Sequence, residues 1–194
     1  MKYKMIFTFL FFSSFMGALE RLPEQYCISY GKKDASLEII EYFSFSCPQC
    51  IRCFTREFEG IKDKYIDSGL IRWVFHPMPM DLSTIQAMHC LSLLDGDKKK
   101  IFLEAILPEM DGQRPDLAVA LMKRAMDFFS QEVIDLENLE LLGETSTFQD
   151  AFSYVNQDNT VEAVPSLEVN GKQLSEIPTE YTVERLWNQI KETL

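Results

Sequence analysis

The sequence predicts an α/β fold in which a long helical segment interrupts the strands. An apolar run at 37–44 is followed by a cysteine motif, by a segment with helical spacing and by a second strand-like run at 71–75. Only helical patterns follow from 82 to about 154. Strand patterns return at 166–174, which gives the order strand, strand, helix, strand, helical insertion, hairpin, helix.

The first strands flank the cysteine motif. Gln25–Tyr30 alternates well enough for a short strand, and Leu37–Ser44 suits a buried central strand. Pro48 stands where a first helical residue belongs, and Gly69 ends that helix. Ile71–Phe75 is the next strand, so we expect a parallel pair with a right-handed crossover. The apolar positions at helical spacing are Phe54, Phe58, Ile61 and Tyr65.

The insertion is predicted to be helical throughout. Its breaks are Gly96, Pro108, Gly112 and Gly143. The expected helices are Leu82–Leu94, Lys98–Leu107, Pro115–Phe129, Gln131–Leu142 and Thr147–Val155.

The C-terminal part predicts a hairpin and a closing helix. Ser166–Val169 and Lys172–Leu174 flank Asn170-Gly171, a dipeptide that supplies the positive φ angles of a type I′ turn. Thr182–Leu194 is expected to form an amphipathic helix. The apolar face of this helix consists of Val183, Leu186, Trp187 and Ile190.

Composition and charge limit the class of protein. The 194 residues are 46% hydrophobic and 25% charged, which is typical of one sizeable globular domain or a domain with an insertion. The formal net charge of -11 argues against nucleic acid or an anionic membrane surface as the main partner.

The N-terminal segment 1–18 has the pattern of a secretory signal peptide. Lys2 and Lys4 precede the apolar stretch Met5–Met16, which is followed by the small residues Gly17 and Ala18. The stretch is too short to span a bilayer as a helix, although a buried N-terminal helix or an uncleaved anchor would share the pattern. Export to the periplasm would favour redox chemistry over zinc binding for a CxxC pair.

The spacing of Cys47 and Cys50 predicts a redox centre. A helix N-terminus offers unpaired N–H groups and partial positive charge, which stabilise a thiolate at Cys47. Cys50, one turn further, would be more buried and could resolve a mixed disulfide. Glu41, in the preceding strand, could carry a proton to or from Cys50.

Several alternatives remain open on the residues alone. The pair could be a structural disulfide, although so short a loop stabilises little. Glu41 could be solvated at a strand edge. Cys53 could join Cys47 and Cys50 in a metal site with a fourth ligand from His76, His89 or Cys90, but buried packing of Cys53 and no metal is the preferred interpretation. Cys27 and Cys90 could pair or stay free.

Two motifs give the chain a recognisable likeness. EYFSFSCPQC at 41–50 and VEAVPSLEVNGKQL at 161–174 resemble the DsbA family of thiol:disulfide interchange proteins. The resemblance implies a thioredoxin fold with an inserted all-helical domain and no cofactor. It places the first part of the thioredoxin-like domain at 19–80, the helical insertion at 81–157 and the second part at 158–194.

The resemblance also implies roles for particular residues. Cys47 would be the attacking thiol, Cys50 the resolving thiol and Glu41 the buried acid. Pro165 would be the cis-proline facing the disulfide, and Val164 would pair its backbone with an extended substrate peptide. Two further residues, Pro48 and Gln49, would tune the active site. Because the best-studied oxidases have histidine in place of Gln49, a less oxidising centre is expected.

The function implied is that of a periplasmic oxidase. Its partners would be reduced exported proteins and a quinone-linked membrane protein that re-oxidises it. A disulfide reductase or isomerase is the alternative, but 19–36 is too short for the added N-terminal module of dimeric isomerases, so a monomer is expected. Cys53 departs from the family, which commonly has a larger or aromatic residue there.

Overall fold

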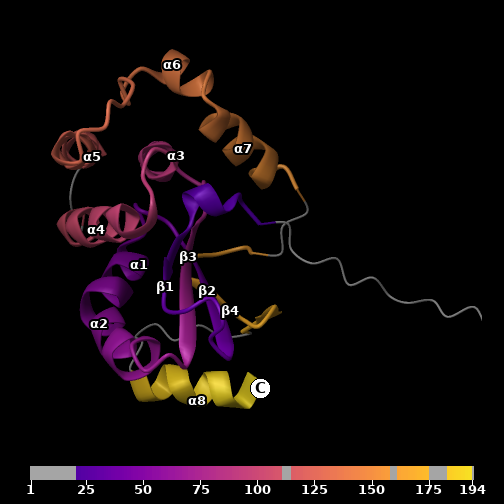
Figure 1. Ribbon diagram of the computed structural model, residues 1–194. Coiled ribbons are helices and arrows are strands. Elements are labelled where there is room, and N and C mark those ends of the chain that lie inside the picture. The colour runs from indigo at the N-terminus through magenta and orange to yellow at the C-terminus, as the bar shows by residue number, and fades with distance from the viewer. Residues whose placement is uncertain (1–20, 111–114, 158–160, 175–182, 194) are drawn as a thin grey trace, which may run out of the picture.

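A single mixed sheet organises the protein. The computed structural model describes residues 21–110, 115–157, 161–174 and 183–193 (Figure 1). The sheet has the strand order β1-β3-β2-β4-β5, in which β2 and β3 run parallel and the other neighbours are antiparallel. The strands are β1 (Ile28–Tyr30), β2 (Leu37–Phe43), β3 (Ile71–Pro77), β4 (Ser166–Val169) and β5 (Lys172–Gln173). The parallel pairing of the two strands around the cysteine motif is therefore confirmed.

One long helical segment connects β2 to β3. It begins with α1 (Pro48–Cys53) and continues through a π-helical stretch at Phe54–Phe58, α2 (Glu59–Ile61) and a second π-helical stretch at Lys62–Ile66. Proline is favourable at the first position of α1 because the N–H that it lacks would have no helical partner. The two π-helical stretches were not expected from the sequence.

Both faces of the central strand are buried. Ile39 and Phe43 belong to the cluster that includes residues of α1, α4 and α8, whereas Ile40 and Tyr42 belong to a second cluster with residues of α3 and α7. Successive side chains of a strand point to opposite faces, so a strand covered on both sides is almost continuously apolar. Glu41 therefore lies on the same face as Ile39 and Phe43, toward the cysteine helix.

The helices between β3 and β4 gather mainly beyond one end of the sheet (Figure 1). They are α3 (Leu82–Ser92), α4 (Gly96–Ile106), α5 (Pro115–Phe128), α6 (Leu139–Gly143) and α7 (Ser146–Val155). Among the described residues, no helix is both long enough and apolar enough to cross a membrane. Gly96 and Gly143, expected as breaks, are the first residue of α4 and the last residue of α6.

The prediction of a helix at Gln131–Leu142 is wrong. Ser130 has a φ of 55°, which turns the chain after α5, and residues 131–138 are not helical. The side chain of Leu136 is fully buried, and its carbonyl accepts a 2.7 Å hydrogen bond from Nε2 of Gln86. Tertiary contacts therefore replace the helical hydrogen bonds that the apolar spacing suggested.

The first strand is shorter than expected. Residues Glu24–Tyr26 form a 3-10 turn, and only Ile28–Tyr30 pairs with β3. Nζ of Lys99 donates hydrogen bonds to the carbonyls of Glu24 and Cys27, which satisfies backbone groups outside the sheet. A lysine far along the chain thus stabilises a turn that strand periodicity could not reveal.

The C-terminal elements agree with the prediction. Asn170 and Gly171 have φ values of 46° and 84° in the turn between β4 and β5. The final helix is α8 (Val183–Thr193), where Leu186 and Ile190 are buried and Trp187 stacks on Tyr65 with ring centroids 4.6 Å apart. The side chain of Val183 and the segment 1–18 lie outside the described residues.

Candidate active site

Cys47 occupies the N-cap position of α1. Its backbone is extended, with φ of -81° and ψ of 111°, and Pro48 begins the helix directly after it. The sulfur accepts a hydrogen bond from the backbone N–H of Cys50 at 3.2 Å, and the residue is half-buried. The structure therefore places an accessible sulfur against the unpaired donors of a helix N-terminus.

This environment favours the thiolate of Cys47. Its pKa is lowered to about 6, chiefly by the side-chain hydrogen bond from Cys50. Backbone N–H groups of Cys50 and Gln49 and the positive charge of Arg52 lower the pKa further, while burial opposes them. Most of Cys47 is consequently ionised at neutral pH.

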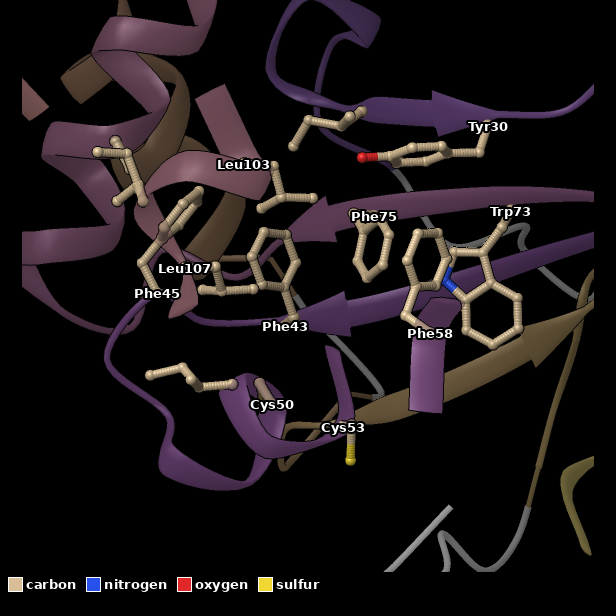
Figure 2. Close-up of a cluster of buried hydrophobic side chains, with 14 of the residues drawn as sticks. Tyr30, Phe43, Phe45, Cys50, Cys53, Phe58, Trp73, Phe75, Leu103 and Leu107 are labelled. Carbon is tan, nitrogen blue, oxygen red and sulfur yellow. The ribbon is translucent and has the colours of Figure 1, made fainter. Parts of the chain in front are cut away.

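Cys50 has the opposite character. The residue is 1% exposed and lies beside the aromatic cluster that Figure 2 shows between α1 and the sheet. Burial is the main reason that the pKa of its thiol is raised, and its hydrogen bond to Cys47 and the negative charge of Cys47 raise it further. One sulfur of the pair is therefore a half-buried thiolate, and the other is a buried, protonated thiol.

Glu41 is a buried carboxyl near this pair. It is 4% exposed, and its Oε2 accepts a 3.1 Å hydrogen bond from Nε1 of Trp73. Burial raises its pKa to about 8, the charge of Cys47 adds to the rise, and the hydrogen bond from Trp73 opposes it. A strand-edge position is thus excluded, and the carboxyl can hold a proton at neutral pH.

A distant part of the chain completes the site. The Val164–Pro165 peptide bond is cis, and Cys47 Sγ lies 3.6 Å from the carbonyl oxygen of Val164, to which the protonated thiol donates a hydrogen bond. Pairing of β2 with β4 sets Glu41 opposite Leu167, so the ladder holds the segment before β4 beside the cysteine motif. Binding of a substrate backbone at Val164 stays a prediction.

The side chain of Gln49 contacts two residues of its own helix, Arg52 and Cys53. Its Nε2 donates to Sγ of Cys53 at 3.5 Å, and its Oε1 accepts a 2.9 Å hydrogen bond from Nη2 of Arg52. Gln49 lowers the pKa of Cys47 through its backbone N–H. Sequence reasoning missed Arg52, although its position one turn after Gln49 and near Cys47 was a usable signal.

The loop between β2 and α1 is fixed from the helical insertion. Oδ2 of Asp81, the N-cap residue of α3, accepts hydrogen bonds from the hydroxyls of Ser44 at 2.6 Å and Thr84 at 2.9 Å. Oγ1 of Thr84 in turn accepts from the backbone N–H of Phe45 at 3.0 Å. These residues were also missed, because a contact between segments about forty positions apart has no local sequence signal.

Cys53 is a buried residue of α1 that lies close to the side chain of Gln49. It is 6% exposed, and Figure 2 shows its side chain on the side of the helix away from the aromatic rings. The described residues contain no group of three His, Cys, Asp or Glu side chains placed to hold a metal ion. His76, one of the ligands considered, instead accepts a hydrogen bond at Nε2 from the backbone N–H of Leu22.

The remaining cysteines are half-buried Cys27 and buried Cys90. Cys27 and Cys90 are not joined by a disulfide, and they pack against different hydrophobic clusters. Burial raises the pKa of each to about 12. Both are therefore poor nucleophiles beside Cys47.

Comparison with known proteins gives two kinds of likeness in sequence. The family model described as Thioredoxin matches residues 24–192. A protein of Rickettsia bellii named "Putative protein-disulfide oxidoreductase" is 32% identical over 84 residues, which cover 42% of this chain and 32% of that protein. The matched region is thus about a third of the length of that curated relative.

Solved structures share the whole architecture. Oxidised BdbD from Bacillus subtilis matches with a TM-score of 0.60 and 21% identity, over 89% of this chain and 93% of that chain. The alpha-DsbA1 protein of Wolbachia pipientis matches with a TM-score of 0.64 and 20% identity, over 88% and 92%. These matches confirm the fold that the sequence motifs predicted, while the boundaries at 80/81 and 157/158 stay predictions.

Proposed function

Because this chain belongs to the thioredoxin family, we propose that it is a thiol–disulfide oxidoreductase whose Cys47–Cys50 pair introduces disulfide bonds into other proteins. The observation that carries the proposal is the contrast between the two sulfurs. Cys47 is an accessible thiol with a pKa of about 6, and Cys50 is buried with a raised pKa. A disulfide that releases so acidic a thiol is a good electron acceptor, because the low pKa makes Cys47 a good leaving group.

The reaction begins with the Cys47–Cys50 disulfide. A substrate thiolate attacks Sγ of Cys47, which forms a mixed disulfide and releases Cys50 as a thiolate that takes up a proton. A second substrate thiol, once deprotonated, attacks the substrate sulfur of the mixed disulfide and displaces Cys47 as a thiolate. The substrate loses two electrons and two protons, and the enzyme becomes the dithiol.

Glu41 is proposed to supply the proton that Cys50 needs. With a pKa of about 8, it is mostly protonated at neutral pH and can give its proton to the newly formed thiolate. The carbonyl of Val164, beside Cys47, is proposed to mark the strand-like segment along which an extended substrate backbone binds.

The cellular setting belongs to the same proposal. Export to the periplasm rests on the pattern of residues 1–18, and the substrates would then be reduced exported proteins. A quinone-linked membrane partner would restore the disulfide after each cycle. A monomer is sufficient for this chemistry, since both sulfurs come from one helix.

The redox equilibrium with glutathione tests the direction of the reaction. We expect the Cys47–Cys50 pair to have a potential well above the approximately -270 mV of thioredoxin. A value at or below that level would replace the oxidase with a reductase. Treated with oxidised glutathione, Cys50→Ser should accumulate a Cys47–glutathione mixed disulfide, because Cys47 displaces one glutathione thiol and no resolving thiol follows. The matched variant Cys90→Ser keeps Cys50 and should proceed to the Cys47–Cys50 disulfide instead.

A further inference from the structure

Arg52 is a charged residue of α1 that takes part in none of the proposed reaction steps. It is half-buried in α1, and its Nη2 donates to Oε1 of Gln49 at 2.9 Å. This contact runs backward along the helix, so it directs the guanidinium toward the N-terminus where Cys47 lies. Within the described part of the chain, no carboxylate lies within 4.0 Å of Arg52, so no ion pair there neutralises its charge.

Gln49 is itself held at both ends of its amide. While Oε1 accepts from Arg52, Nε2 donates to the sulfur of buried Cys53 at 3.5 Å. A side-chain amide with an anchored nitrogen presents its oxygen in a fixed direction. The third cysteine of the motif therefore has a structural use, because its sulfur orients the amide that binds Arg52.

Among the residues that the structure describes, the other groups near Cys47 do not provide a second cation. From α1 come the thiol and N–H of Cys50, from β2 comes buried Glu41, and from the segment before β4 comes the carbonyl of Val164. Asp81 is the nearby charge from α3, and it reaches the loop before Cys47 through Ser44. Each of these charged side chains is an acid, so Arg52 is the group that can favour a thiolate by its charge.

We infer that Arg52 is a charge that tunes the Cys47 thiolate and that Gln49 is the positioning residue that holds it there. The positive charge of Arg52 is among the causes that lower the pKa of Cys47, which agrees with this assignment. The consequence for redox chemistry rests on the proposed function: a better stabilised thiolate makes the disulfide form more oxidising. The effect on acidity does not depend on that function.

The test compares two arginines of one helical segment. Arg52→Gln and Arg56→Gln remove the same charge, but Arg56 is exposed and lies one turn further from Cys47. The acid dissociation constant of Cys47, measured from iodoacetamide reactivity against pH in the reduced protein, should fall about two- to fivefold in Arg52→Gln. It should not change in Arg56→Gln, and Arg52→Lys should recover part of the loss.

Salt and a double variant separate the two roles. Added salt should weaken the ionisation of Cys47 in the wild type more than in Arg52→Gln, because it screens the charge that the variant lacks. Gln49→Ala should lower the dissociation constant partway, and the double variant Gln49→Ala/Arg52→Gln should match Arg52→Gln alone. Additive effects would overturn the positioning role of Gln49, and equal constants in wild type and Arg52→Gln would overturn the role of Arg52.

The outcome also distinguishes this inference from the proposed function. If the wild-type protein fails to oxidise dithiols while Arg52→Gln still weakens the ionisation of Cys47, the oxidase proposal fails and the inference stands. If the wild type is an oxidase and both arginine variants change the dissociation constant equally, the effect is one of net charge and the inference fails. Unchanged urea midpoints would show that the variants are folded.

Discussion

Nε1 of Trp73 donates a 3.1 Å hydrogen bond to Oε2 of Glu41, a carboxyl that is almost entirely buried. The two residues come from the parallel neighbours β2 and β3, and their side chains meet on the face of the sheet that carries the cysteine helix. A lone indole donor does not replace the hydration that a carboxylate loses on burial. The acid therefore stays protonated well above its usual range.

Glu41→Gln should make stability less sensitive to pH. The folded pKa of about 8 lies above the ordinary 4.5, so the folded state holds the extra proton between these values, and stability falls as pH rises from about 4.5 to 8. Glutamine keeps an acceptor for Trp73 but cannot ionise. Relative to wild type, the variant should gain on the order of 5 kcal/mol between about pH 4 and pH 9, measured by urea unfolding of the reduced proteins. A pH-independent difference would contradict this.

The reduced protein should gain stability over the oxidised protein as pH rises from about 6 to 9. Cys47 has a folded pKa of about 6 against an ordinary 9.0, so its contribution is present above 9 and is lost as pH falls through 6. Oxidation removes the ionisable thiol. Measuring the free energy of unfolding of both forms across this range checks the prediction. The variant Cys47→Ser lacks this thiol, so its stability should not show the gain between pH 6 and pH 9.

Asp81→Ala should destabilise the protein by about 2 kcal/mol. The substitution removes the N-cap of α3, whose Oδ1 accepts from the N–H of Thr84 at 2.9 Å, and it leaves the hydroxyl of Ser44 without this acceptor. Asp81→Asn, which retains a capping oxygen, should lose less. Urea midpoints provide the measurement, and equal losses in the two variants would show that the cap is not the cause.

Cys53→Ser should keep most of the dithiol oxidation that Cys47→Ser abolishes. Cys53 is buried, and its sulfur contacts the amide of Gln49 rather than completing the redox pair. Serine preserves an acceptor for that amide. Oxidation of a small dithiol peptide, followed by its free-thiol content, is the assay. Loss of activity in Cys53→Ser would assign the third thiol to the catalytic cycle.

Local signals explain what could be predicted from the sequence. Pro48 indicated the start of α1, because its ring fixes the backbone in a helical conformation. Asn170-Gly171 indicated the turn of the last hairpin, because both residues tolerate positive φ angles. The positions of Cys47 and Cys50 followed from the start of that helix. The run around Ile39 and Ile40 indicated a strand buried on both faces, which the two hydrophobic clusters confirm.

Contacts between distant segments explain what could not be predicted. The stretch 131–138 has apolar residues at helical spacing, yet Gln86 holds the carbonyl of Leu136 and Ser130 adopts a left-handed conformation. Asp81 reaches the active-site loop only once α3 is folded against it. The orientation of the Gln49 amide depends on two side chains of the same helix, which a pattern of residue types does not specify.

The contact between Cys47 and Val164 joins positions 117 residues apart, so it forms late in the synthesis of the chain. The ribosome makes α1 and its cysteines long before it makes the Val164–Pro165 segment, whose carbonyl contacts the sulfur of Cys47. During that interval Cys47 lacks its contact with the carbonyl of Val164. The contact between Cys47 and Val164 can therefore form only after residue 164 has been made, and a disulfide formed earlier at Cys47 would cross-link an incompletely folded chain.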